Sequence, residues 1–154
     1  MAFWLACAGA LGSGTVGGIF FAFSNFVMAA LGRLPPAQGA AAMNAINVTV
    51  LNPLFFVVFF GTGFLGLALL FVSIMLWPEP GARWLLAAAL TYLVGCIGVT
   101  MVFNVPLNNA LGAAPNDGEL WTRYRRVWTA WNTVRTLACI AASGLFVAAL
   151  ISLT

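Results

Sequence analysis

A chain of 154 residues is long enough for one domain, but its composition is not that of a soluble protein. Hydrophobic residues make up 63% of it and charged residues only 6%, whereas about a quarter of a typical soluble domain is charged. The net charge of +3 is too small for nucleic-acid binding through phosphate contacts. Because histidine is absent, histidine-ligated metal sites and histidine general bases are excluded. The composition predicts a protein whose main partner is the lipid bilayer.

Four apolar stretches are long enough to cross about 30 Å of hydrocarbon as helices. They cover about residues 2–31, 52–76, 83–105 and 132–153. Backbone groups cannot stay unpaired in lipid, and the stretches are continuous rather than alternating, so each should be an α-helix and not a barrel strand. The sequence therefore predicts an all-α, up-and-down bundle of four transmembrane helices that forms a single integral membrane domain, residues 1–154.

Two of the connections should extend this bundle. The first loop should hold a short helix that begins after Pro35 and Pro36. In the third loop, Asn116 and Glu119 have the spacing of a helix start, with Asn116 as the N-cap. The fourth helix should thus begin outside the hydrocarbon and enter it near Asn132.

The positive charges predict the orientation of the bundle. Loops one and three lie on the same side of the membrane and carry four of the six arginines, whereas the opposite side has Arg83 beside Glu79. The positive-inside rule places loops one and three in the cytoplasm and both termini outside a cell (inner) membrane. The four arginines are Arg33, Arg123, Arg125 and Arg126.

Polar side chains are costly inside a membrane, so their positions point to function. Here they gather at the end of the bundle where helices one and three finish and helices two and four begin. We expect Pro106 to break the end of helix three and to turn the neighbouring asparagines inward. Helical spacing places Phe21 and Asn25 on one face of helix one. The cluster comprises Asn25, Asn44, Asn47, Asn52, Asn104, Asn108, Asn109, Tyr124, Trp128, Trp131, Asn132 and Arg135.

Several of these residues also have simpler interpretations. Trp121 and Trp128 are at positions typical of the interfacial aromatic belt, and Asn52 of a helix cap. Arg135 is close enough to the membrane surface to snorkel outward. Small residues at intervals of four favour close helix packing, and also suit self-association into a homo-oligomer. They are Ala10, Gly14, Gly18 and Ala22.

The chemistry that such a cluster offers is narrow. It holds amide, indole, phenol and guanidinium groups, and the three cysteines lie in separate stretches without ligand-like spacing, so we expect no metal. Catalysis by a Ser-His-Asp triad is excluded because there is no histidine. Aromatic walls would stack on a flat apolar molecule, amides would hydrogen-bond its oxygens, and Arg135 would stabilise an oxyanion.

Two motifs resemble the anthrone oxygenase-like family, also called the domain of unknown function 1772 family: Asn-Val-Pro-Leu-Asn at 104–108 and Trp-Asn-Thr-Val-Arg at 131–135. Residues 18–28 and 52–55 are similar to the family's first and second helices. The resemblance implies oxidation of an anthrone-like or polyphenolic substrate to a quinone by O2, without metal or flavin. The family commonly has histidine where this chain has Thr133, so the proton acceptor stays unassigned.

We therefore predict a cofactor-independent, membrane-embedded oxygenase. Its catalytic residues should be Arg135, Asn132 and Asn104. Two alternatives remain: a non-catalytic protein that binds or transports a small lipophilic compound, and a structural subunit whose polar face contacts a partner. The predicted substrate-binding residues are Asn25, Asn47, Asn108, Trp128, Trp131, Phe21 and Tyr124.

Overall fold

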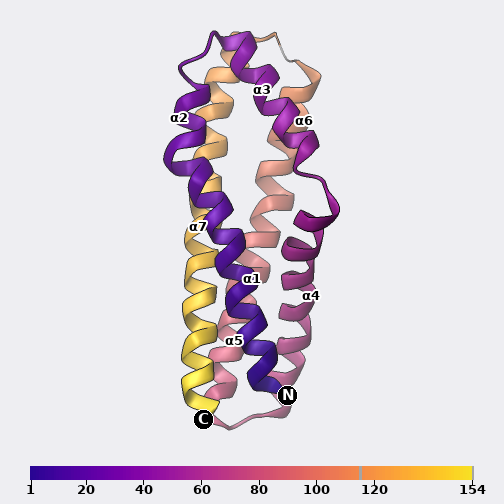
Figure 1. Ribbon diagram of the computed structural model, residues 1–154, viewed down its shortest axis with the longest axis vertical. Helices are drawn as coiled ribbons and strands as arrows, with labels where there is room; N and C mark the ends of the chain where they lie inside the picture. The colour runs from indigo at the N-terminus through magenta and orange to yellow at the C-terminus, as the bar shows by residue number, and fades with distance from the viewer. Residues whose placement is uncertain (115, 154) are drawn as a thin grey trace.

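The computed structural model describes residues 1–114 and 116–153, and it has the predicted all-α architecture. Four helical segments are long and apolar enough to cross a membrane, as expected for a multi-pass membrane protein. They run alternately up and down, so that both termini lie at one end of the bundle and α3 lies at the other (Figure 1). The four segments are Ala2–Leu31, Pro53–Met75, Pro80–Ala113 and Gly118–Leu153.

The first segment contains a π-helical turn that changes which residues face inward. It consists of α1 (Ala2–Ala22), the π-helix η1 (Phe23–Val27) and α2 (Met28–Leu31). Val16 and Phe20 are buried in α1 before this turn, and Met28 is buried directly after it. A π turn takes up more residues than an α turn, and Asn25 lies within it and is exposed. Phe21, at the end of α1, is exposed as well. The structure therefore does not direct these two predicted residues into the bundle.

The short helix expected in the first loop is confirmed as α3 (Pro36–Thr49). Its buried Ala40 and Met43 belong to the same apolar cluster as the aromatic residues of α7. The next helix, α4 (Pro53–Met75), begins at Asn52, whose Oδ1 accepts a hydrogen bond of 3.0 Å from the Phe55 N–H. Asn52 is thus an N-cap, and α3 closes one end of the bundle.

The third segment does not stop at Pro106, and the predicted break is wrong. It runs through α5 (Pro80–Tyr92), the π-helices η2 (Leu93–Gly98) and η3 (Thr100–Asn104), and α6 (Val105–Ala113). The Val105 N–H donates to the Thr100 carbonyl, five residues back. Proline lacks an N–H and crowds the preceding turn, and the wider π turn accommodates it without ending the helix. As a result Asn108 and Asn109 lie within helix α6, beyond the predicted helix end at Pro106.

The last helix, α7 (Gly118–Leu153), is longer than a membrane crossing requires. Its 36 residues give a length of about 54 Å, against about 30 Å of hydrocarbon. It begins one residue later than predicted, because Asp117 and not Asn116 provides the cap. The Asp117 Oδ1 accepts 2.9 Å hydrogen bonds from the N–H groups of Glu119 and Leu120.

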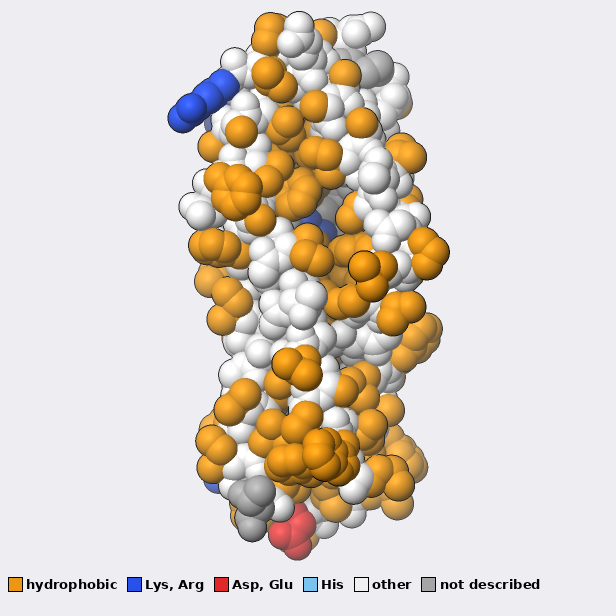
Figure 2. Space-filling view, viewed as in Figure 1, with side chains coloured by type: hydrophobic (Ala, Val, Ile, Leu, Met, Phe, Trp, Pro, Cys, Tyr) orange, Lys and Arg blue, Asp and Glu red, His pale blue; other side chains and the backbone are white. Residues whose placement is uncertain are grey.

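Small residues bring α1 close to α7. A Cβ at Gly9 would lie 2.9 Å from the Phe146 ring, and one at Gly17 would lie 3.1 Å from the Cys139 Cβ. Part of the predicted stripe lies in this contact: a Cβ at Gly14 would lie 3.3 Å from the Ser143 Oγ, and the Ala10 carbonyl accepts a 2.9 Å hydrogen bond from that hydroxyl. Gly18, by contrast, has no atom within 4 Å of the place of a Cβ. Outside the bundle, apolar side chains such as Phe64 are exposed along the spans, as the orange surface of Figure 2 shows.

The docking of α3 yields a stability prediction. A Cβ at Gly39 would lie 2.8 Å from both the Leu31 carbonyl oxygen and the Trp121 ring, so Gly39→Ala should destabilise the protein by about 1–3 kcal/mol. Gly61→Ala is the matched control, because nothing lies within 4 Å and alanine favours the helix. Thermal unfolding in detergent measures both. Equal melting temperatures for the two variants would contradict the close packing of α3.

Candidate functional site

A cavity of about 600 Å³ lies inside the half of the bundle that α3 closes. Figure 2 shows a hollow in the upper half of the molecule, rimmed by apolar side chains, with a basic side chain at its base. Aromatic walls are provided by Phe20, Phe23, Phe55, Phe56, Phe59, Phe60 and Trp128. Polar groups reach it from α3, from the third segment and from the last helix: Asn44, Asn47, Thr100, Asn108, Asn109 and Arg135.

The Arg135 guanidinium is held on three sides. Its Nη2 donates to the Asn132 Oδ1 at 2.6 Å, and its Nη1 donates to the Thr100 Oγ1 at 3.1 Å. Its Cζ lies 4.0 Å from the centroid of the Phe20 ring, which is cation–π distance. With only 4% of its surface exposed, Arg135 is buried among these partners. The alternative in which it snorkels to the membrane surface is therefore wrong.

No carboxylate is placed to neutralise Arg135. The chain has three acids: Glu79 at the opposite end of the bundle, and Asp117 and Glu119 at the start of α7. Sixteen residues separate Glu119 from Arg135, about 24 Å along a helix. A guanidinium has five N–H donors, and the Arg135 Nε is buried without a hydrogen-bond partner among the described residues. The site therefore offers spare donors and an uncompensated positive charge to a ligand oxygen.

Asn132 positions Arg135 and does not line the cavity. Its Nδ2 donates to the Phe20 carbonyl at 2.7 Å and to the Ser24 Oγ at 2.8 Å. Ser24 lies in the π turn η1, and Phe20 lies in the last turn of α1, directly before it. With Nδ2 so engaged, the Oδ1 is turned toward the guanidinium. The predicted catalytic residue Asn132 thus connects α7, the first segment and Arg135.

The asparagines of the third segment have different surroundings. The Asn108 Oδ1 accepts hydrogen bonds from the Tyr124 hydroxyl at 2.9 Å and the Trp128 Nε1 at 2.8 Å. Both bonds use the amide oxygen of Asn108 as the acceptor, so the Nδ2 of the same amide remains available to donate a hydrogen bond. Asn104 is buried behind the cavity wall, where its Nδ2 donates to the Trp128 carbonyl at 3.3 Å. Its Oδ1 is buried without a partner among the described residues.

The structure brings some predicted site residues together and separates others. Trp121 and Trp128 are buried, which excludes a lipid-facing aromatic belt for them. Trp131 stacks on Phe103 with ring centroids 3.6 Å apart and does not line the cavity. The Thr133 hydroxyl also lies elsewhere, 3.0 Å from the Ser24 Oγ. Of the ten predicted residues, Arg135, Asn47, Asn108 and Trp128 line the cavity, Asn132, Asn104 and Tyr124 lie behind its wall, and Phe21, Asn25 and Trp131 lie apart.

Several residues that line the cavity were not predicted, and Thr100 and Phe59 are two of them. Thr100 accepts from Arg135, and it precedes Asn104 by four residues in an apolar stretch, so helical spacing alone was sufficient to find it. Phe59 lines the cavity and stacks on Phe55 with ring centroids 5.3 Å apart. The sequence has 13 phenylalanines, and nothing in the local pattern distinguishes Phe59 from its neighbours.

The donor set of the cavity suits an organic ligand. Its polar lining is made of amides, one hydroxyl and one guanidinium. Among the described residues, no three His, Cys, Asp or Glu side chains gather in a group that would hold a metal ion. An aromatic-walled cavity with a few polar groups is the usual form of a small-molecule site.

The described residues thus form four helical segments that are long and apolar enough to cross a membrane, and they surround an aromatic-walled cavity. The family model of anthrone oxygenase matches residues 55–145, which is more than half of the chain. The chain therefore belongs to the anthrone oxygenase family. The match includes Thr100, Asn108, Trp128 and Arg135. No curated protein and no solved structure matches the chain.

The shared acceptor at Asn108 gives a second prediction. Asn108→Leu leaves the Tyr124 hydroxyl and the Trp128 Nε1 without their partner, at about 1–3 kcal/mol for each buried donor. Asn108→Asp keeps an acceptor and should lose less. The melting temperature and the tryptophan emission spectrum measure the effect, with Asn109→Leu at the exposed neighbour as control. An Asn108→Leu protein as stable as wild type would show that these hydrogen bonds do not hold the cavity wall.

Proposed function

We propose that this protein oxidises an anthrone-like, phenolic aromatic compound to a quinone with O2, using no resident cofactor. The observation that carries the proposal is the buried Arg135, which has no carboxylate partner and lies in the wall of an aromatic cavity. Membership of the anthrone oxygenase family supports an oxygenase role at the level of the family.

The cavity suits a flat, fused-ring substrate. Its volume of about 600 Å³ is within the usual range for small-molecule sites, about 300–1,000 Å³. Phe20, Phe59 and Trp128 present ring surfaces on which an aromatic ligand stacks. The Arg135 guanidinium and the Asn108 Nδ2 then donate to its phenol or carbonyl oxygen. These two donors come from helices α7 and α6, so they fix the ligand at two points.

The proposed reaction converts a ring methylene and O2 into a carbonyl and water. Loss of one methylene proton gives an anion whose charge is spread onto the ring oxygen. The anion is oxidised by O2 as a bond forms between the former methylene carbon and one oxygen atom, and the resulting peroxide anion takes up a proton to become a hydroperoxide. Loss of water, which carries off the second methylene hydrogen, forms the carbonyl.

Arg135 acts on the first step by stabilising the anion. Each unit by which the pKa of the carbon acid falls corresponds to about 1.4 kcal/mol of differential stabilisation. Fixed donors that are protected from water can supply such stabilisation without reorganising. Asn132 and Thr100 hold the guanidinium in place, so we propose that they are positioning residues.

The proton acceptor is proposed to be water or hydroxide. The chain has no histidine, and the lining residues that the structure describes include no carboxylate. The same observation favours a second candidate function, in which the protein binds or transports a lipophilic phenol without catalysis. Binding of a phenol without O2 consumption would support this second function.

We also propose that the end closed by α3 faces the cytoplasm of a cell membrane, because Arg33, Arg123, Arg125 and Arg126 lie at that end. The C-terminus would then be outside. Alkaline phosphatase fused to the C-terminus would be active in this orientation, and an inactive fusion that is stably expressed would reverse it.

The central prediction concerns Arg135. Arg135→Met should lower O2 uptake with anthrone or a hydroxylated anthrone by about 10²–10³-fold, the usual effect of losing one oxyanion donor. Its folding should be preserved, because the change removes a buried charge that has no carboxylate partner. Arg135→Lys should keep part of the activity. Arg83→Met, at the far end of the bundle, is the matched control and should keep wild-type turnover.

Asn132→Leu separates positioning from binding. It should lower kcat more than it raises KM, because the guanidinium stays present but is no longer held. Oxygen electrode assays across a substrate range give both constants. Full turnover in Arg135→Met would remove the basis of the proposed mechanism, whereas ligand binding without turnover in the wild type would favour the second function.

A further inference from the structure

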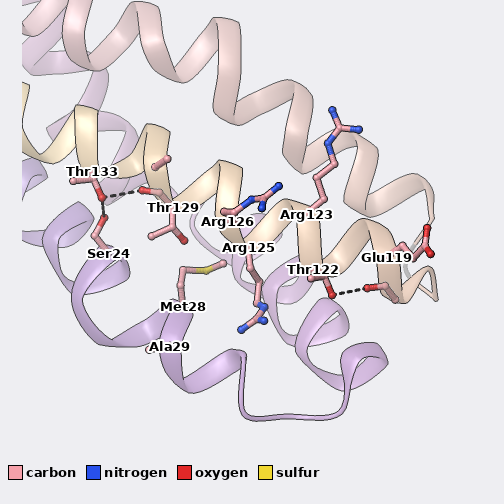
Figure 3. Close-up of a pocket in the computed structure, with 12 residues that line it drawn as sticks. Ser24, Met28, Ala29, Glu119, Thr122, Arg123, Arg125, Arg126, Thr129 and Thr133 are labelled. Carbon is pink, nitrogen blue, oxygen red and sulfur yellow. Dashed lines mark hydrogen bonds between the residues drawn. The ribbon is translucent and has the colours of Figure 1, made fainter.

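A second hollow lies between α2 and α7, and it shares no lining residue with the Arg135 cavity. It is an open groove of about 970 Å³. Figure 3 shows residues of the first segment, among them Ser24 and Met28, on one side and the α7 residues on the other. The α7 residues Gly118, Thr122, Arg126, Thr129 and Thr133 follow each other at intervals of three or four, so the groove follows one face of that helix.

Positive charge dominates one part of this groove. Arg123, Arg125 and Arg126 line it, against the single carboxylate of Glu119. Arg125 is packed in place: its Cζ lies 5.9 Å from the Trp121 ring centroid, and a Cβ at Gly32 would collide with its Nη1. The Arg125 Nε is buried without a hydrogen-bond partner among the described residues. The groove therefore has one fixed guanidinium, that of Arg125, and two exposed ones, those of Arg123 and Arg126, which extend from α7 in another direction (Figure 3).

The arginines lie at the depth of lipid headgroups. Twenty-seven residues separate Arg126 from Leu153, about 40 Å along α7. A bilayer measures about 40–45 Å between the outer limits of its headgroup regions. With Leu153 at one membrane surface, Arg126 is thus at the opposite headgroup layer, and Arg135, nine residues further along, is below it.

The rest of the groove suits an apolar chain. Beyond the arginines it is lined by Met28, Ala29 and Ala130, together with the hydroxyl residues Ser24, Thr129 and Thr133. The Thr133 hydroxyl bonds to the Ser24 Oγ and to the Thr129 carbonyl. These hydroxyls therefore have partners within the protein, and the groove changes from cationic to largely apolar along α7.

We propose that this groove is a binding site for an anionic phospholipid, with the headgroup phosphate at Arg125 and Arg126 and an acyl chain along Met28, Ala29 and Ala130. The chemistry recognised by the guanidinium groups is that of a phosphate. The apolar continuation and the headgroup depth favour a lipid over free phosphate. A zwitterionic lipid carries no net charge to complement the three arginines.

Lipid titration of the purified protein in neutral detergent tests the proposal. Native mass spectrometry and thermal unfolding are measured with phosphatidylglycerol, phosphatidylcholine or inorganic phosphate. We expect phosphatidylglycerol to bind and to raise the melting temperature, and the other two to have little effect. Arg125→Gln and Arg126→Gln should each weaken binding about fivefold, the usual contribution of one basic residue at an anionic membrane surface.

Arg83→Gln is the matched control, because Arg83 lies at the end of the bundle opposite the groove, where its guanidinium is 5.5 Å from the Trp84 ring centroid. It should bind phosphatidylglycerol as the wild type does, and so should Arg135→Met, which separates this site from the proposed oxygenase function. Equal binding of phosphatidylcholine and phosphatidylglycerol would overturn the proposal. So would an equal effect of inorganic phosphate, or unchanged binding in a folded variant that carries both Arg125→Gln and Arg126→Gln.

Discussion

A single guanidinium, buried without a carboxylate partner, is the interaction on which the rest of this site depends. A buried charge is tolerated when hydrogen bonds and polarisable groups surround it, and Arg135 has Asn132, Thr100 and the Phe20 ring around it. Each of these partners comes from a different part of the chain. The fold of the bundle thus brings Arg135 on α7 together with the residues that stabilise its charge. Part of the guanidinium remains available to a ligand.

Two π-helical regions make this arrangement possible. In the first segment, η1 places Ser24 and the Phe20 carbonyl where the Asn132 amide meets both. In the third segment, η3 allows the helix to continue past Pro106, so that Asn108 on α6 reaches the indole of Trp128. Irregular turns within transmembrane helices are therefore directly beside the functional groups, as is common for π-bulges.

The same turns explain how far the sequence predicts the structure. Apolar length was enough to locate four helices, and α3 and the Asn52 cap follow from local signals. Regular helical spacing does not hold within a π turn, where Asn25 is exposed, and the break expected at Pro106 does not occur because a π turn accommodates the proline. Phe21 lies in α1, and local spacing does not distinguish it from the buried Phe20. Arg135 is predictable because a charged group is rare in an apolar stretch, and Asn47, Asn108 and Trp128 are predictable because polar and aromatic groups gather at the same end of the bundle. Phe59 was missed because its contact depends on tertiary packing alone.

The account is tested most directly by an experimental structure of the protein with a hydroxylated anthraquinone, the product class of the proposed reaction. It predicts that an oxygen of the quinone or its phenol lies about 3 Å from the Arg135 guanidinium. The rings should lie against Phe20, Phe59 or Trp128. A quinone bound outside this cavity, or an Arg135 side chain directed to the lipid, would contradict it.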